Sequence, residues 1–599
     1  MIYHCEDHTC NYWDEGEKLP ERCPQCGRKL LRANEADMTG DDWTALGNTL
    51  WDAEASDKKR MVDCFRKAAY LGSAWGVCNL GICMEQGNGV EADPVQAFWL
   101  YQQAVEMGSL NAVCCLGVCY QYGIGTAPDA EKAAELYCKA AEYGSPRGQM
   151  LLARAFHDGI GVEADAAEAV HWVRAAAYQR YGEGMHRLGV CYAYGDGVEQ
   201  NWEHAVHWFR EAAESGVSTA MTDLGYCYEK GCGVEQSWEQ AFSWYRRGAE
   251  CGDLRSMHNL GYCYEKGRGV EQSWEQAFSW YRRGAECGYP VSMSNLGLCY
   301  KRGYGVDQNW QEAIKWYEQG AQCGHLQSMH NLACCYERGE GVEQNEERAL
   351  YWYRRGAEAG SDYCMYCLGW NYSNGEGVEQ NMTEAIRWYT AAAEGGNADA
   401  MHDLGWLYDH GEGVEQDMKK AICWYERAAE QNHPAAMNSL GECYAMGRGV
   451  PRDLETAMEW YRRAAELGEA MADYNMGWHL EQAGKLSEAY AHYRKAADGN
   501  DDSAWWALGR FYENGVVVAQ DGKEARRCYE TGEKLGSVKC KMRLARCKLL
   551  GIGGRRAKKA GLDLCRQALE LAKESSEKED YGYEAEMNLL RRTIAENES

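Results

Sequence analysis

Apolar and small residues recur along most of the chain with a period of 36 residues. The clearest marker is a leucine, usually followed by glycine, which begins at Leu80 and returns at every thirty-sixth position up to Leu440. Ten equal intervals in succession indicate a chain built from copies of one unit. A tryptophan followed by a second aromatic residue runs in step with this leucine from Trp208 to Trp460. Each unit therefore has two halves.

Both halves have the spacing of an amphipathic helix. In one unit Ser256, Leu260 and Tyr264 are separated by four residues each, which places them on one face of a helix that we call helix A. In the second half, the apolar and small residues from Ala277 to Ala285 follow the pattern i, i+3, i+4, i+7, i+8. This second segment is helix B.

The loop between the two helices has the pattern Gly-x-Gly-Val in most units. Its first glycine, Gly267 in this unit, is expected to end helix A in the left-handed conformation, and Val270 to fill the gap between the helices. Ser273 with Gln276 three residues later predicts a capping box at the start of helix B. A phosphate-binding loop is excluded because no strand precedes the loop and no Lys-Ser or Lys-Thr pair follows it.

Neither helix buries its apolar face alone, so neighbouring pairs must stack. We expect an all-α fold, a right-handed α/α superhelical solenoid of about 15 two-helix repeats over residues 36–575. One unit lacks the Gly-x-Gly-Val loop, which predicts a shortened repeat near residues 476–495. Residues 576–599 are expected to form a C-terminal capping helix and tail.

The unit reads A-x-x-L-G-x-x-Y-x-x-G-x-G-V, then a cap residue, A-x-x-W-Y and A-A-E-x-G. It resembles the Sel-one-like repeat (SLR), a relative of the tetratricopeptide repeat, over roughly residues 41–573. The resemblance implies an adaptor that assembles protein complexes. One Cys-rich secreted branch of the family has been connected with β-lactam binding, which gives a ligand-binding or hydrolytic protein as an alternative. That branch pairs cysteines between helices, whereas here the recurring cysteine lies inside the L-G-x-C-Y run.

The resemblance also implies a partner-binding surface. In tetratricopeptide relatives the position before the anchor leucine lies on the concave side of helix A, where asparagine can hold the backbone of an extended peptide. In this chain that position and its aromatic neighbours give the candidate residues Asn79, Asp223, Asn259, Asn295, Asn331, Asp403, Tyr226, Tyr262, Trp370 and Trp406. A polar helix face exposed to solvent is the alternative interpretation.

Charge and composition restrict the partner class. A formal net charge of −28 and a pI near 5.1 disfavour non-specific binding of nucleic acid or anionic membrane. No run approaches the ~20 apolar residues of a membrane span, and the first residues are polar, so we expect a cytoplasmic protein. No Ser/His/Asp set or nucleotide motif is present, so we expect neither an enzyme nor a small-molecule substrate.

One basic stretch leaves nucleic acid as a further alternative. Residues 539–559 contain no acidic residue and carry Lys539, Lys541, Arg543, Arg546, Lys548, Arg555, Arg556, Lys558 and Lys559. Such a basic end, together with the cysteine-rich N-terminal segment, could bind nucleic acid. It could also bind an acidic partner or the acidic body of another copy, or it could be a solvated face.

Two sets of cysteines stand out among the 29. Nine recur at one place in successive repeats and are interpreted as small apolar core residues. Four near the start of the chain, Cys5, Cys10, Cys23 and Cys26, have the spacing of a tetrahedral metal site and resemble a rubredoxin-like zinc ribbon over residues 1–35, with His8 as an alternative ligand to Cys10. We expect structural zinc, with iron second and free thiols as the remaining possibility.

Four histidines recur every 72 residues, two positions before the anchor leucine: His186, His258, His330 and His402. Helices pack ~8–10 Å apart, so histidines two repeats apart are too distant to share a metal ion. We interpret this row as a partly exposed helix position that was inherited when a pair of units was duplicated.

Overall fold

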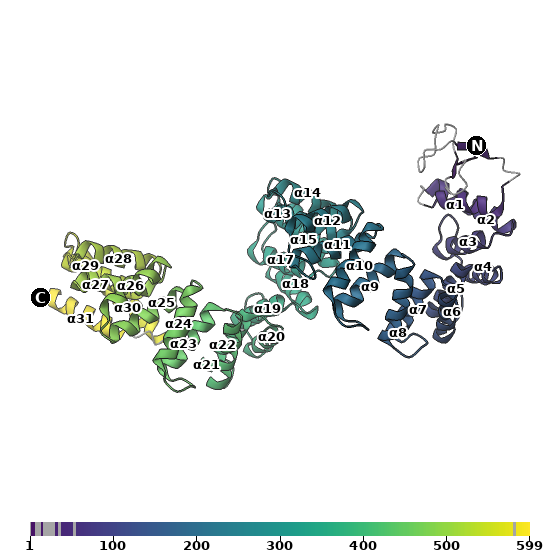
Figure 1. The fold of residues 1–599 in the computed structure, drawn as a ribbon. Helices are drawn as coiled ribbons and strands as arrows, with labels where there is room; N and C mark the ends of the chain where they lie inside the picture. The colour runs from purple at the N-terminus through teal and green to yellow at the C-terminus, as the bar shows by residue number, and fades with distance from the viewer. Residues whose placement is uncertain are drawn as a thin grey trace. The chain divides into compact units, whose positions relative to one another are not determined.

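The computed structural model describes residues 2–5, 13–15, 30–33, 38–51, 55–578 and 583–598. The chain divides into two compact units, Met1–Asn309 and Trp310–Ser599. Each unit consists mainly of successive antiparallel helix pairs, which Figure 1 labels in chain order.

Three short strands precede the first helix. They are β1 (Ile2–Cys5), β2 (Trp13–Glu15) and β3 (Leu30–Ala33). The strands form one antiparallel sheet in the order β2-β1-β3, with Tyr3 opposite both Asp14 and Arg32.

The first compact unit continues with fifteen helices in its described part. They are α1 (Gly40–Thr49), α2 (Ala55–Tyr70), α3 (Ala74–Gln86), α4 (Pro94–Glu106), α5 (Leu110–Tyr122), α6 (Ala130–Glu142), α7 (Pro146–Asp158), α8 (Ala166–Tyr178), α9 (Gly182–Tyr194), α10 (Trp202–Glu214), α11 (Ser218–Lys230), α12 (Trp238–Glu250), α13 (Leu254–Lys266), α14 (Trp274–Glu286) and α15 (Pro290–Arg302).

The second compact unit holds sixteen helices in its described part. They are α16 (Trp310–Gln322), α17 (Leu326–Arg338), α18 (Glu346–Glu358), α19 (Asp362–Asn374), α20 (Met382–Glu394), α21 (Ala398–His410), α22 (Met418–Glu430), α23 (Pro434–Met446), α24 (Leu454–Glu466), α25 (Ala470–Gln482), α26 (Leu486–Asp498), α27 (Asp502–Asn514), α28 (Gly522–Lys534), α29 (Val538–Leu550), α30 (Lys558–Lys578) and α31 (Glu584–Glu598).

The predicted two-helix repeat is confirmed. Over the described residues, α1 to α14 form seven consecutive pairs in the first unit and α17 to α30 form seven in the second, in which odd-numbered helices are A and even-numbered helices are B. Gly267 ends α13 with a φ of 66°, as expected for a left-handed cap. The Ser273 hydroxyl accepts the N–H of Gln276 at 3.3 Å and so caps α14. Val270 packs against the adjoining core.

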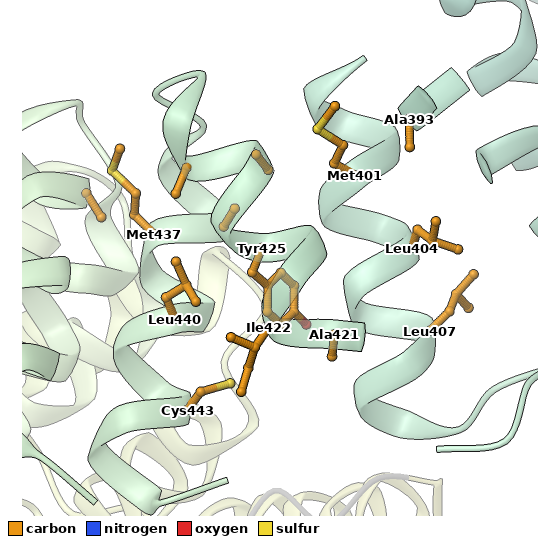
Figure 2. Close-up of a cluster of buried hydrophobic side chains, with 14 of the residues drawn as sticks. Ala393, Met401, Leu404, Leu407, Ala421, Ile422, Tyr425, Met437, Leu440 and Cys443 are labelled. Atoms are coloured by element: carbon orange, nitrogen blue, oxygen red, sulfur yellow. The ribbon is translucent and has the colours of Figure 1, made fainter. Parts of the chain in front are cut away.

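The core lies between helices A and B and between successive pairs. In the second unit, Figure 2 shows the Tyr425 ring of α22 between the side chains of α21 and those of α23, such as Leu440. In this repeat the glycine after the anchor leucine makes room for the tyrosine. A Cβ added at Gly405 would lie 2.7 Å from the Tyr425 ring, which is closer than carbon atoms approach without strain.

The A helices of neighbouring repeats approach each other directly. Contacts join α1 with α3, α3 with α5, α5 with α7 and α11 with α13 in the first unit, and α27 with α29 in the second. In the described part of the chain, successive B helices do not come equally close. In these repeats the A helices therefore lie closer together than the B helices, and we call the side of a stack that the A helices form its inner side.

The shortened repeat and the terminal helix both form. Only Ala483, Gly484 and Lys485 join α25 to α26, in place of the seven-residue loop seen after α13. Met587 and other apolar side chains of the last helix, α31, pack against α29 and α30, together with Tyr583 just before the helix.

Candidate protein-binding surface

The predicted Asn/Asp row lies on the A helices α3, α11, α13, α15, α17 and α21. Asn79 is buried, and its amide donates to the Asn48 side chain at 2.8 Å. Asn259 and Asn331 are half-buried, and Asn331 accepts a bond from Gln327 of its own helix at 3.0 Å. The row is therefore only partly exposed, and many of its polar atoms are engaged within the stack.

The other three members of the row, Asp223, Asn295 and Asp403, each form a hydrogen bond with the preceding repeat. In each pair, the first residue lies two positions before its anchor leucine. The second lies one position before the anchor leucine of the next repeat. The pairs are His186 with Asp223 at 2.7 Å, His258 with Asn295 at 3.4 Å, and Tyr366 with Asp403 at 3.1 Å. These bonds give two of the four recurring histidines a contact between successive A helices, which our sequence analysis missed. The constant separation of 37 residues was the signal that could have revealed it.

The four predicted aromatic residues follow the same inner side, two positions after each anchor. Tyr226 is 46% exposed, Trp370 is 46% exposed and Trp406 is 40% exposed, whereas Tyr262 is half-buried. Two residues that the sequence analysis did not select occupy the same repeat position and are similarly exposed: Leu298 and Trp478. We call this set of side chains the inner apolar row.

Some of the predicted residues come together in one pocket of the second unit. Trp370 of α19 and Trp406 of α21 line a pocket of about 280 Å³ with Asp403. Met382 and Tyr389 of the intervening helix α20 also line it. The other predicted residues are distributed along their A helices, so they extend a surface and do not converge on one centre.

A second pocket, of about 490 Å³, lies between α7 and α9 in the first unit, and the sequence analysis did not identify it. His157 contacts Asp158 at 2.6 Å and Asp196 at 3.4 Å, and Arg187 contacts Asp196 at 3.5 Å. The hydrogen bond from His157 lowers the pKa of Asp158. Most of the charges in this pocket are therefore already paired with each other.

The cysteines with described side chains are all free thiols, mostly buried in the core. Burial raises the pKa of Cys83 to about 11 and that of Cys263 to about 12. At neutral pH these residues are protonated apolar groups, as expected for core cysteines. The described thiols include none of the inter-helix disulfides on which the β-lactam-associated alternative depends.

The proposed metal ligands cannot be placed. Cys5 is the last residue of β1, whereas His8, Cys10, Cys23 and Cys26 lie outside the described residues. Within the described residues, no three histidine, cysteine or acidic side chains are arranged to hold a metal ion. The zinc ribbon therefore stays a prediction.

Some basic residues of the stretch near the C-terminus form ion pairs within the chain. Arg543 contacts Glu586 at 2.6 Å and Glu513 at 3.3 Å, and Arg546 also pairs with Glu513. Arg556 bonds to Asn597 at 2.6 Å. The exposed remainder is concentrated in residues 555–559.

None of the described helices combines the length and the apolar character needed to cross a membrane.

The fold and its inner surface define an α-helical repeat protein of the tetratricopeptide-like class. The Sel1 repeat model matches thirteen segments: residues 76–109, 112–145, 146–181, 182–217, 218–253, 254–289, 290–325, 326–361, 362–397, 398–433, 434–469, 470–501 and 504–537. The chain therefore belongs to the Sel1 repeat family. Proteins of this family generally mediate protein–protein interactions and are typically non-enzymatic scaffolds.

Two solved structures are similar to the chain. One is c5321, a protective antigen present in uropathogenic Escherichia coli strains displaying an SLR fold, with 32% identity over 75% of this chain and 97% of its own, and a TM-score of 0.49. The other is a Sel1 repeat protein from Oxalobacter formigenes, with 27% identity over 51% of this chain and 89% of its own, and a TM-score of 0.40. No curated protein matches the chain.

Proposed function

We propose that the protein is an interaction scaffold that binds an extended protein segment along the inner surface of its A helices. The supporting observation is the inner apolar row, which leaves large apolar side chains in water on the side that successive A helices share. Trp370 and Trp406 are 46% and 40% exposed. Apolar side chains exposed together in a pocket mark binding sites more often than isolated ones do.

The polar row beside it supports the same function. Bonds such as His186 to Asp223 link successive A helices and hold their side chains in fixed positions. A binding surface that is ordered before the partner arrives loses less conformational entropy on binding. Amides of this row such as Asn259 are half-buried, so they remain partly accessible to the backbone of a partner.

The test compares variants of this surface with a matched control. Partners captured from native lysate by the full chain are identified by mass spectrometry, and binding of the purified partner is then measured directly. The double variant Trp370→Ala, Trp406→Ala should weaken binding at least about tenfold, the size expected for removing aromatic anchors. Tyr351→Ala on the B helix α18, where the side chain is 53% exposed, should leave binding unchanged. Equal binding by all three proteins would refute an inner binding surface in this unit.

We also propose that the N-terminal segment binds zinc in a structural ribbon. The antiparallel sheet β2-β1-β3 supports this proposal because its first strand ends at Cys5, one of the suggested ligands. Elemental analysis of the purified full chain should find about one zinc per chain, as four protein ligands form a closed site. The variant Cys23→Ser, Cys26→Ser should lose it, whereas Cys251→Ser, which removes an exposed thiol elsewhere, should retain it.

A further inference from the structure

The pocket between Trp370 and Trp406 has an unusual distribution of charge. Asp403 of α21 and Glu412 of the following loop line it together with the two indole rings. Among the described residues that line this pocket, none is a lysine, an arginine or a histidine. The pocket is therefore aromatic and acidic, with no cation of its own.

Several tryptophan rings on the B helices of the same unit are covered by the chain's own cations. The guanidinium of Arg427 lies 4.3 Å from the Trp424 ring, and that of Arg463 lies 4.4 Å from the Trp460 ring, both on B helices. In the described part of the chain, no lysine or arginine lies over Trp370 or Trp406. The rings of Trp370 and Trp406 thus lack the lysine or arginine that covers the tryptophan rings on the B helices.

The first unit shows what fills the equivalent place there. Tyr262 holds the same repeat position as Trp406, and the guanidinium of Arg268 lies 5.3 Å from its ring. Arg268 is the second residue of the Gly-x-Gly-Val loop, eight positions after the anchor leucine. At the same loop position, the repeats of Trp370 and Trp406 carry Glu376 and Glu412. The charge beside the aromatic ring is therefore reversed, and in the described part of the chain no lysine or arginine takes the place of Arg268 beside Trp406.

The rings and the carboxylate are held in place by other contacts. Trp406 stacks on His410 with the ring centroids 4.2 Å apart. Asp403 accepts the Tyr366 hydroxyl at 3.1 Å and contacts His402 at 3.0 Å. A carboxylate has about four acceptor positions, so these two contacts leave capacity for a further donor.

We propose that this pocket binds a lysine or arginine side chain of the partner segment. The aliphatic part of that side chain lies between Trp370 and Trp406, and its charge lies close to Asp403 and Glu412. A cation over an indole face and beside a carboxylate gains from both interactions, and the apolar stem covers the exposed rings. This inference rests on the proposed function, because it names the chemistry of the segment that the inner surface binds.

The experiment uses the full chain and a fluorescein-labelled peptide, Gly-Gly-Arg-Gly-Gly-Arg-Gly-Gly, with binding measured by fluorescence anisotropy. Replacing each arginine of the peptide by neutral citrulline should weaken binding about tenfold, the factor that corresponds to a cation–π contact together with an ion pair. The variant Trp370→Ala, Trp406→Ala should have the same effect.

A charge reversal separates this pocket from general attraction to an acidic protein. Glu412→Arg places a cation where Arg268 stands in the first unit and should abolish most of the arginine-dependent binding. Glu430→Arg changes the net charge equally at the exposed end of the B helix α22 and should weaken binding no more than about twofold. Equal losses in the two charge variants, or no loss in the tryptophan variant, would overturn the inference.

The captured partner distinguishes this inference from the proposed function. If partner binding is lost in the tryptophan variant but is insensitive to Glu412→Arg, the scaffold function stands and the basic side chain is excluded. If partner binding is insensitive to every change on the A helices, the proposed function itself fails.

Discussion

At the scale of single residues, polar side chains cap the helices of this array, and one of these caps, Asp501, is partly buried between repeats. Asp501 caps α27 by accepting the N–H of Ala504 at 2.7 Å. Burial raises its pKa from 3.8 to about 6. In other repeats a neutral side chain performs the same task, for example Asn397 at the start of α21. The cap does not require a charged side chain, so the buried charge of Asp501 lowers the stability of the folded state without improving the cap.

This shift gives the capping residue a defined pH dependence. Because the folded state holds the proton of Asp501 more tightly than the unfolded state, its contribution to stability is complete below pH 3.8 and is lost as the pH rises through about 6. Asp501→Asn should therefore raise the free energy of unfolding by about 1–2 kcal/mol at pH 7 and leave it unchanged near pH 4. Thermal unfolding at the two pH values measures the difference. Asn397→Asp should produce the opposite change, and a pH-independent effect in either variant would contradict the assignment.

A second residue-scale contact recurs within the repeats. The Tyr281 hydroxyl of α14 donates to the Glu265 carboxylate of α13 at 2.8 Å, and this carboxylate is largely buried. Tyr281→Phe removes the donor and should lower local stability by about 1–2 kcal/mol. Hydrogen exchange in α13 and α14 provides the measurement. Tyr389→Phe is the control: its hydroxyl meets Ser373 at 3.3 Å instead of a carboxylate, so the loss there should be smaller.

At the scale of helices and loops, the two glycines of the Gly-x-Gly-Val loop have different tasks. The first ends helix A, whereas the second packs against the preceding repeat. A Cβ at Gly269 would lie 2.1 Å from the backbone oxygen of Trp238 at the start of α12. The loop therefore determines how closely one repeat approaches the next.

This close approach can be separated from backbone strain. Gly269 and Gly252 both have positive φ, 71° and 89°, but a Cβ at Gly252 meets nothing within 4 Å. Gly252→Ala should cost only the left-handed conformation, about 1–2 kcal/mol. Gly269→Ala adds a clash with backbone and should cost about 3 kcal/mol or more. Urea unfolding followed by circular dichroism would compare them. Equal losses would show that the loop does not control the contact between repeats.

The helices could be predicted from the sequence because each position of the repeat occurs many times along the chain. The pattern around Leu260 predicted α13, and that around Trp280 predicted α14 with its cap at Ser273. The hydrogen bonds between successive A helices were missed because they join different positions of successive repeats, as in His186 with Asp223. Periodicity reveals which positions are equivalent, but it does not show which unlike positions touch.

The candidate site was predicted only in part, for the same reason. Trp370, Asp403 and Trp406 were selected one by one and are found in one pocket. The role of Glu412 follows only from its place beside Trp406, and the charged pocket around His157 depends on contacts between α7, α9 and the loop at Asp196. These are properties of three-dimensional proximity that a one-dimensional pattern does not contain.

At the scale of the whole molecule, an array of repeats has two ends that must be closed, since an end repeat has only one neighbour. In the second unit, α31 performs this role with two kinds of contact. Met587 and Leu590 cover the apolar side of α29 and α30. Glu586, which is 6% exposed, pairs with Arg543, whose side chain is 13% exposed. Two residues of the basic stretch, Arg543 and Arg556, thus help to attach the capping helix.

Disturbing this cap should destabilise the end of the array before the rest. Glu586→Gln leaves Arg543 with Glu513 as its remaining acidic partner and should cost about 2–3 kcal/mol, because a buried cation then lacks part of its compensation. The loss should be confined to α29, α30 and α31, since each repeat of an array contacts chiefly its neighbours. Hydrogen exchange resolved by segment tests this, with Glu584→Gln, an exposed residue of the same helix, as the control. Faster exchange spread evenly to α17 would show that the second unit unfolds as a single cooperative block, whereas faster exchange restricted to the last three helices identifies α31 as a cap that stabilises only the repeat it covers.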